Sequence, residues 1–409
     1  MAKEYKDLIV ALDIGTAEIK VAVAEIQADG TLKLAGLGVA PSNGLKRGVV
    51  VNIDATVQSI QQALKEAEQV SACRITRVCT GITGSHVRVM NSSGMVAVKD
   101  REIGAADVAR VVDIASAVSI PNDQRVVLIE RQEFVIDGQE VREPVGMSGV
   151  RLEAKVHIVT GAQSAVDNVL KCVRRCGLEV DHLTFNPLAS SLAVLSDDER
   201  ELGVALVDIG AGTTDVAIFT GGAIRHSAVI PIAGDLITSD IAMALRTPTK
   251  DAEDVKIEFG CAKQVLADPD AQVDVPGLGD RAPRKISRQA LAGVIEPRVE
   301  EIFSIVQQTI AESGCSEVLS SGIVITGGSA VMPGMVELGE DIFLKPVRRG
   351  LPKYGGPLAE LVAAPRAATA MGMLEEMRLA QLRGLKLEAQ RGSVKSAMGR
   401  VKDWFVGNF

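Results

Sequence analysis

The chain has 409 residues, of which 47% are apolar and 23% are charged, which suffices for two or more lobes with large buried cores. Its net charge of −8 gives no electrostatic reason to expect a nucleic acid as a partner. No apolar run reaches the roughly 18–20 residues of a membrane-spanning helix, and the opening MAKEYKDLIVALDIG does not resemble a secretory signal.

The first ordered segment predicts two strands joined by a tight turn. The apolar run LIVALDI leads into a turn of small residues that begins at Asp13, and the alternating run EIKVAVAEI follows. The turn contains Gly15 and Thr16, and Lys20 lies in the second strand.

The stretch from about residue 85 to residue 159 predicts a small α+β subdomain, because strand-like and helix-like patterns alternate in it. AADVARVVDIA has the spacing of an amphipathic helix, and Asp137-Gly138 is typical of a hairpin turn. Beyond it, Cys172 and Cys176 lie four residues apart on a predicted helix near His182. One such pair alone does not predict a metal site, and six cysteines without an export signal indicate reduced thiols.

The opening pattern returns 195 residues later without a gap, as GVALVDIGAGTTDVAIFTG. Asp13 corresponds to Asp208, Gly15 to Gly210 and Lys20 to Asp215. Two related lobes that face each other would place the two turns on either side of a cleft.

The second turn, GAGTTD, is neither a dinucleotide fingerprint nor a Walker loop. It lacks the third glycine, it leads into a strand instead of a helix, and no GK[ST] follows. Its glycines and threonines can still present backbone N–H groups and hydroxyls to phosphate oxygens. Asp13 and Asp208 suit Mg²⁺ held through water, since that ion keeps most of its hydration shell.

A third glycine loop interrupts the predicted strand Ile323–Thr326 at Gly327-Gly328-Ser329. Such a loop can present its backbone to a nucleotide. Any one of the three loops alone would fit an ordinary tight turn. All three in this order are much more specific.

The end of the chain has a charge and an apolar pattern of its own. From Arg378 onward the net charge is +5, which leaves −13 on the body. A predicted helix from Ser393 would carry an apolar stripe beside basic residues, as in a helix that lies in lipid headgroups. The stripe contains Val394, Ala397, Met398, Val401, Trp404 and Phe405, followed by Phe409, and the flanking cations are Lys395, Arg400 and Lys402. The alternative is that the stripe packs on the protein's own body or in a partner's groove.

DIGTAEIK, DIGAGTTD and ITGGSAVMPG resemble the first phosphate, second phosphate and adenosine motifs of the actin superfamily. The insert and the basic aromatic tail are similar to those of one branch, the FtsA family of bacterial cell-division actin homologues. The resemblance covers most of the chain. It implies an α/β, two-lobed, actin-like (ribonuclease H-like) ATPase fold that binds ATP and Mg²⁺ between its lobes.

The resemblance also implies roles for the loop residues. Gly15, Thr16 and Lys20 would grip the β- and γ-phosphates, and Asp13 and Asp208 would order the water around Mg²⁺. The second lobe would clamp the phosphates with Gly210, Gly212, Thr213 and Thr214, and the adenosine would meet Gly327, Gly328 and Ser329.

Two further assignments each leave a second interpretation open. AEDVKIEFG resembles the segment that reaches the ribose and adenine, here Glu253 and Lys256, but a solvated helix face with i,i+3 pairing fits equally well. Asn186 stands where filament-forming relatives carry the Glu or Gln that orients the attacking water. Because Asn cannot act as a base, hydrolysis should be slow at most; the alternative is a helix cap.

For function, the resemblance implies a peripheral protein on the cytoplasmic face of the bacterial inner membrane, at the division septum. It would polymerise, bind anionic lipids through its tail, hold the C-terminal peptide of FtsZ and recruit other divisome proteins. An acidic peptide could meet Arg281, Arg284, Lys285 and Arg288, although a charge run also fits a solvated face. The alternatives are the inner-membrane actin-like scaffold of pilus assembly and a small-molecule kinase of the superfamily.

The expected boundaries follow from these motifs. They are 1–84 for the first lobe, 85–159 for the insert, 160–202 for the first lobe continued, 203–234 for the second lobe, 235–300 for its outer part, 301–377 for the second lobe with a return helix, 378–392 for a linker and 393–409 for the membrane-targeting helix.

Overall fold

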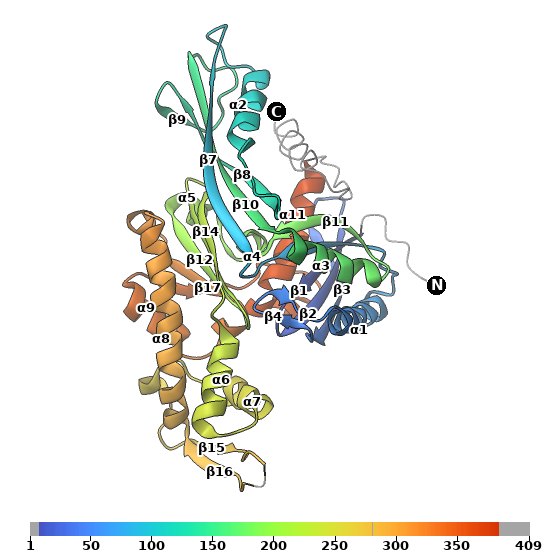
Figure 1. Cartoon of the computed structure of the whole chain (residues 1–409), viewed down its shortest axis with the longest axis vertical. Coiled ribbons are helices and arrows are strands. Elements are labelled where there is room, and N and C mark those ends of the chain that lie inside the picture. Colours follow the sequence, from blue (N-terminus) through green and yellow to red (C-terminus); the bar gives the residue numbers. More distant parts are fainter. Residues whose placement is uncertain (1–7, 280, 384–409) are drawn as a thin grey trace.

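Two five-stranded sheets with the same topology form the centre of the molecule (Figure 1). The computed structural model describes residues 8–279 and 281–383. The first sheet has the order β11-β6-β1-β2-β3 and the second the order β14-β13-β12-β17-β18. The first sheet comprises β1 (Leu8–Ile14), β2 (Glu18–Ile26), β3 (Leu32–Pro41), β6 (Arg77–Ile82) and β11 (Glu179–Phe185). The second comprises β12 (Val204–Ile209), β13 (Thr214–Thr220), β14 (Ala223–Ile230), β17 (Ile323–Thr326) and β18 (Val347–Arg349).

The repeat in the sequence is also a repeat in strand register. In the antiparallel pair β1–β2, Asp13 lies opposite Lys20, and in β12–β13, Asp208 lies opposite Asp215. Each of these hairpins then pairs in parallel with the next strand, β6 or β17. The two-lobed architecture predicted from the repeat is therefore confirmed.

Two helices, α4 (Asn186–Val194) and α11 (Ala368–Leu382), pack together between the sheets. The sheets present small side chains to them, such as Ala11 and Ala217, within one shared core. Gly372 on α11 allows the close approach, because a Cβ atom there would collide with the carbonyl oxygen of Ala189 on α4.

Other helices cover the outer faces of the two sheets. They are α1 (Ile53–Ser71) and α3 (Gln163–Arg175) on the first lobe, and α8 (Arg288–Glu312) and α9 (Met335–Phe343) on the second. The shorter elements are β4 (Leu45–Lys46), β5 (Val49–Val50), α5 (Asp197–Leu202), α10 (Ala359–Val362) and the 3-10 turns η1 (Gln264–Leu266), η2 (Ser316–Val318), η3 (Gly328–Val331) and η4 (Pro365–Ala367).

The insert is a four-stranded sheet, in the order β7-β10-β8-β9, with one helix packed on it. Its elements are β7 (Val87–Ala97), α2 (Ala105–Ser116), β8 (Gln124–Ile136), β9 (Gln139–Val141) and β10 (Arg151–Ala162). The predicted helix and hairpin turn are confirmed. Asp137 and Gly138 have φ of +50° and +94°, the pair of positive values that a type I′ turn requires.

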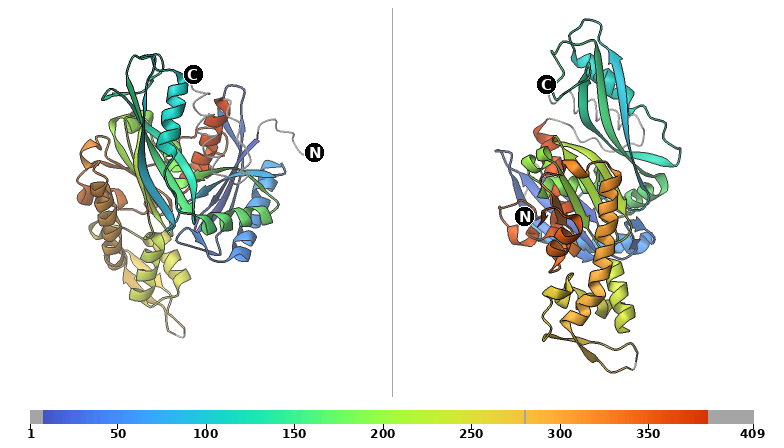
Figure 2. Two further views of the ribbon diagram at one scale, coloured as in Figure 1. Left: turned by 45° about the horizontal axis from the view of Figure 1, so that its top comes forward. Right: turned by 90° about the vertical axis from the view of Figure 1, so that its left-hand side faces the viewer.

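The insert and the outer part of the second lobe lie at opposite ends of the long axis (Figures 1 and 2). The outer part comprises α6 (Gly234–Leu245), α7 (Thr249–Phe259), β15 (Gln272–Val275), β16 (Arg284–Ser287) and the start of α8. The functions expected of these two parts would therefore act at separate places.

The predicted linker begins too early. Residues 378–382 are the last residues of α11, since Arg378 pairs with Glu375 and donates to the carbonyl oxygen of Gly30 at 3.0 Å. Leu382 also lies against Gly30. None of the helices within residues 8–279 and 281–383 is long and apolar enough to cross a membrane.

Candidate functional site

The two repeated turns share one backbone hydrogen bond. The N–H of Gly15 donates to the carbonyl of Glu18 at 3.1 Å, and the N–H of Gly210 donates to that of Thr213 at 2.9 Å. A Cβ on Gly15 would stand 2.7 Å from the Glu18 oxygen, which is too close for any side chain. The turns predicted to face phosphates therefore have the same tight geometry in both lobes.

The turns also meet across the space between the lobes. A Cβ on Gly212 would lie 2.6 Å from Oγ1 of Thr16 and 2.9 Å from Cα of Arg47. The hydroxyl of Thr16 accepts a hydrogen bond from the N–H of Gly48 at 3.2 Å. Only glycine at position 212 lets the second lobe approach this part of the first.

The third glycine loop joins the second turn. The hydroxyl of Ser329 donates to the carbonyl of Gly210 at 2.9 Å. Gly327 has φ of +89°, and a Cβ there would collide with the carboxylate of Asp208. Gly328, by contrast, is exposed and faces open space. All three loops thus converge, and Gly328 is the open position.

Three aspartates gather where the loops meet, and the third was not predicted as a site residue. Burial raises the pKa of Asp13 to about 6, although Lys20 opposes this and Asp208 adds to it. Burial also raises the pKa of Asp208. Burial, followed by repulsion from Asp208, raises the pKa of Asp215 to about 8. The repeat itself, which aligns Asp215 with Lys20, was the signal that could have identified it.

Side chains from both lobes hold these carboxylates. Ser190 on α4 donates to Oδ2 of Asp208 at 2.6 Å, and Thr369 on α11 also contacts it at 3.4 Å. Thr83, at the root of the insert, donates to Oδ2 of Asp215 at 2.7 Å. The other oxygen of Asp215 is buried without a hydrogen-bond partner among the described residues. The cluster is therefore coupled to both central helices and to the insert.

Asn186 is the first residue of α4 and does not cap it. Phe185 occupies the cap position, without a side-chain hydrogen bond. The side-chain oxygen of Asn186 is buried without a partner in the part of the chain that the structure describes. It packs against Gly81 so closely that a Cβ on Gly81 would collide with it. Because Asn186 is one helical turn before Ser190, both lie on the face of α4 that meets the cluster.

The two threonines of the second turn differ. Thr213 remains at the cluster, where it opposes the rise in the pKa of Asp215. Thr214 is fully buried, and its hydroxyl donates to the carbonyl of Ile232 at 2.7 Å. The side chain of Thr214 therefore supports the strand here and has no surface for a phosphate.

Glu253 and Lys256 form the i,i+3 pair of the alternative interpretation, in which Lys256 is largely buried while the Glu253 side chain is 39% exposed. The ammonium of Lys256 lies 2.6 Å from Glu253 and donates to Thr238 at 2.8 Å. Only 10% of the Lys256 side chain is exposed. It also reaches the carbonyl of Gly234, whose N–H donates to Gly210. The pair thus lies next to the second turn.

Comparison with known proteins agrees with this geometry. The family model "Cell division protein FtsA" matches residues 205–372, and "SHS2 domain inserted in FTSA" matches residues 84–160. Cell division protein FtsA of Pseudomonas aeruginosa is 53% identical over 98% of both chains, and that of Escherichia coli K12 is 40% identical over 99% of both. The chain belongs to the FtsA family of cell-division proteins.

Solved structures with the same fold are more distant in sequence. A chain of the structure titled "PilM-PilN type IV pilus biogenesis complex" is 18% identical in sequence and has a TM-score of 0.64. The match covers 91% of this chain and 98% of that chain. MreB 5 of Spiroplasma citri bound to AMPPNP is 17% identical, covers 93% and 99%, and has a TM-score of 0.56. They establish an actin-like fold for this family member and nothing further.

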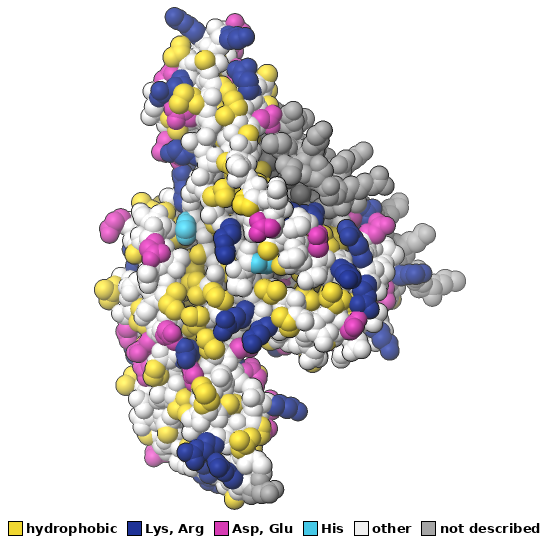
Figure 3. All heavy atoms as spheres, in the orientation of Figure 1, with side chains coloured by type: hydrophobic (Ala, Val, Ile, Leu, Met, Phe, Trp, Pro, Cys, Tyr) yellow, Lys and Arg dark blue, Asp and Glu magenta, His cyan; other side chains and the backbone are white. Residues whose placement is uncertain are grey.

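The four basic residues predicted to meet FtsZ do not act alike. Arg284 donates to the carbonyl of Leu245 at the end of α6, and Arg288 donates to that of Phe259 at the end of α7 at 2.9 Å. Arg281 and Lys285 are exposed, and Lys285 lies 3.9 Å from an exposed Asp274. In Figure 3, basic side chains gather over the end where β15 and β16 lie.

Two further parts of the chain named in the sequence analysis are the cysteine pair and the tail. Cys172 and Cys176 contact backbone carbonyls of α1, and in residues 8–279 and 281–383 no three His, Cys, Asp or Glu side chains are arranged to hold a metal ion. The predicted membrane-targeting helix, 393–409, lies outside the described residues.

Proposed function

We propose that this FtsA-family chain binds ATP with Mg²⁺ where the three glycine loops meet. The observation that carries the proposal is the pair of turns with one shared hydrogen-bond pattern, Gly15 to Glu18 and Gly210 to Thr213, brought together at Thr16 and Gly212. Backbone N–H groups in such turns suit phosphate oxygens. The open position at Gly328 leaves room for the adenosine.

The aspartate cluster fits a magnesium ion. Burial raises the pKa values of Asp13 and Asp208, and Lys20 only partly opposes this at either carboxyl. Mg²⁺ prefers carboxylate oxygens and keeps several waters. The ion would neutralise the phosphates, and Asp13 and Asp208 would hold its water shell.

Hydrolysis in this site should be slow. Asn186 is placed to contact a water, because its buried side-chain oxygen has no partner among the described residues. An amide can orient that water but cannot take its proton. We therefore expect turnover well below the roughly 10 s⁻¹ of a median enzyme, as suits a nucleotide-controlled polymer.

The nucleotide site is tested with Gly328→Ala. The added methyl meets no atom of the protein within 4 Å, so the folded structure should not change. A methyl placed against a bound adenosine should cost about 1–2 kcal/mol, roughly a tenfold loss of affinity. Gly355→Ala is the matched control, since it also meets nothing within 4 Å. Equal affinity of a fluorescent ATP analogue for both variants would refute the placement of the adenosine.

Beyond the nucleotide site, the proposal concerns where the protein acts. Family membership and the basic aromatic tail support a peripheral protein of the inner membrane at the division septum, which self-assembles and recruits divisome proteins. Its tail, 393–409, would lie in anionic lipid. The FtsZ peptide would bind the outer part of the second lobe, where Arg281 and Lys285 are exposed, and where Met243, Ile257 and Val265 expose apolar surface.

A further inference from the structure

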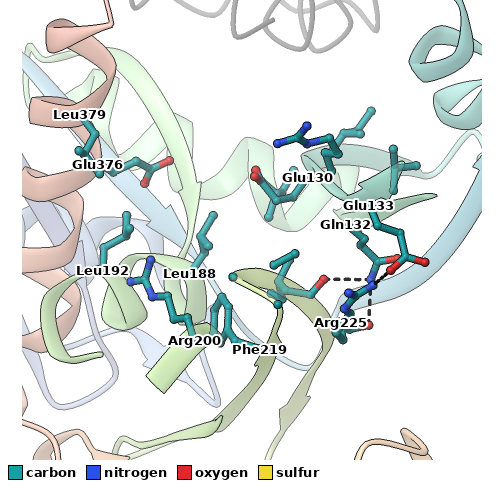
Figure 4. A pocket seen from close by; sticks show the side chains of 18 of the residues that line it. Glu130, Gln132, Glu133, Leu188, Leu192, Arg200, Phe219, Arg225, Glu376 and Leu379 are labelled. Atoms are coloured by element: carbon teal, nitrogen blue, oxygen red, sulfur yellow. Dashed lines mark hydrogen bonds and ion pairs between the residues drawn. The ribbon is translucent and has the colours of Figure 1, made fainter. Parts of the chain in front are cut away.

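A large cavity lies between the insert and the two lobes, away from the glycine loops (Figure 4). Its volume is about 960 Å³, at the upper end for sites that bind small ligands. The walls come from β8 and β9 of the insert, from α4 and α5, from the β13–β14 turn and from α11. Nothing in the proposed nucleotide chemistry uses this space.

The walls combine apolar side chains with carboxylates. Leu188, Leu192, Phe219 and Leu379 line one side. Glu130 comes from the insert and points into the cavity, with Glu376 of α11 across from it. Altogether the lining has three more acidic than basic side chains. It therefore suits a ligand that is both apolar and positively charged.

Glu130 is a lining acid that receives little support from the protein. The structure gives it no hydrogen bond or ion pair within residues 8–279 and 281–383. Burial raises its pKa to about 7, and Glu376 adds to this, although Arg131 and Arg383 partly oppose it. A cation from a ligand would remove that penalty.

The chain itself leads out of this cavity. Leu379, Ala380 and Arg383 all line it. Arg383 directly follows α11 and is the last residue that the structure describes. The remaining residues, 384–409, have three more basic than acidic side chains. That excess matches the acidic excess of the lining. They also carry the apolar stripe that ends in Trp404 and Phe405.

We propose that, in the absence of lipid, residues 393–409 dock their apolar stripe in this cavity, so that the cavity and the membrane compete for the same side chains. The competition with lipid rests on the membrane role proposed above, whereas the docking does not. The tail would then be withheld from the membrane until lipid, or a ligand of the cavity, displaces it.

Because the tail is tethered to α11, even a weak contact is sufficient to dock it in the cavity. Nine residues, 384–392, separate α11's end from the stripe and can span about 30 Å. A short tether gives an effective concentration on the order of 1 mM. A docking site with an intrinsic Kd of about 0.1 mM would thus be about 90% filled, and the apparent membrane affinity would fall about tenfold.

Trp404 is the only tryptophan of the chain, so its fluorescence reports on the tail of the full-length protein directly. The measurement is acrylamide quenching of Trp404 in lipid-free protein, compared with an isolated peptide of residues 393–409 as the exposed limit. The test variant is Glu130→Lys, which breaks no hydrogen bond. The control is Glu300→Lys, the same change of charge at an exposed position of α8 that does not line the cavity.

We expect wild type and Glu300→Lys to protect Trp404 relative to the peptide, and Glu130→Lys to lose that protection. With phosphatidylglycerol vesicles, Glu130→Lys should bind at about tenfold lower lipid concentration. Three results would each overturn the docking. The first is quenching of wild type equal to that of the peptide, and the second is unchanged protection of Trp404 in Glu130→Lys. The third is protection that disappears on dilution, because a contact between two copies depends on concentration. Protection as expected without vesicle binding would leave the docking standing and refute the membrane role.

Discussion

Gly81 on β6 and Asn186 on α4 show how little space single residues leave at the edge of the aspartate cluster. The side-chain oxygen of Asn186 rests on the Cα of Gly81, and Met373 of α11 closes the other side. The backbone of Gly81 lies within a regular strand, so the glycine is required for space and not for its conformational freedom. Any side chain at this position must displace Asn186 from where it meets the site.

We therefore expect Gly81→Ala to lower the free energy of unfolding by about 1–3 kcal/mol, because the methyl overpacks a filled contact. It should also change nucleotide turnover, since Asn186 moves. Urea denaturation and single-turnover assays measure the two effects. Gly355→Ala, whose methyl meets nothing within 4 Å, is the control. A variant as stable as this control would show that the contact between Gly81 and Asn186 is not tight.

Many of these residues follow from the sequence, but not all of their roles do. The glycines were predictable because a tight turn with a close backbone approach restricts the residue type. Asp215 was missed and Thr214 was misplaced, because which side chain of a strand faces the cluster depends on how the lobes meet. The sequence likewise could not show that Arg284 and Arg288 bind backbone carbonyls at helix ends.

Among the elements, the insert is joined in sequence to the first lobe but held by polar contacts to the second. His157 on β10 is fully buried. Its Nδ1 lies 2.7 Å from Oδ1 of Asn91 on β7, and its Nε2 lies 2.9 Å from Oγ of Ser227 on β14. Glu133 of β8 pairs with Arg225 of β14. Movement of one lobe relative to the other must therefore carry the insert along or break these bonds.

This interface predicts a loss of stability in mild acid. Burial lowers the pKa of His157 to about 4, so the unfolded chain binds a proton near its ordinary pKa of 6.5 while the folded chain does not. The contribution of His157 to the free energy of unfolding is complete above about pH 6.5 and decreases as the pH falls toward about 4. At pH 5 the decrease is roughly 2 kcal/mol. The variant His157→Gln should lose that part of the pH dependence, measured by urea denaturation at pH 7.5 and pH 5. Parallel profiles for both proteins would contradict the assignment.

Elements with a strong local pattern were predictable, and those that depend on distant packing were not. The repeated hairpins, the insert helix and the Asp137-Gly138 turn follow from periodicity and turn chemistry. The extension of α11 to Leu382 depends on contacts with Gly30, far away in the sequence. The cavity was also unpredictable, because parts of the chain that lie far apart in the sequence build its walls.

At the scale of the whole molecule, the proposed activities occupy separate places. The nucleotide loops lie between the sheets, and the outer part of the second lobe and the insert form the two ends of the long axis (Figure 1). Such a layout would let one molecule hold FtsZ at one end, as proposed, while its other surfaces remain available for further copies and for the membrane. Many copies in one polymer would convert weak single-tail binding into firm attachment.

The central claim is that this protein anchors FtsZ to the membrane through its tail, and co-flotation of FtsZ with anionic vesicles tests it most directly. With ATP present, wild type should carry FtsZ to the top of the gradient. Trp404→Glu should leave both proteins at the bottom while binding ATP as well as wild type does, because it places a charge where the stripe must enter lipid. Flotation of FtsZ by the Trp404→Glu variant to the same extent as by wild type would contradict the account.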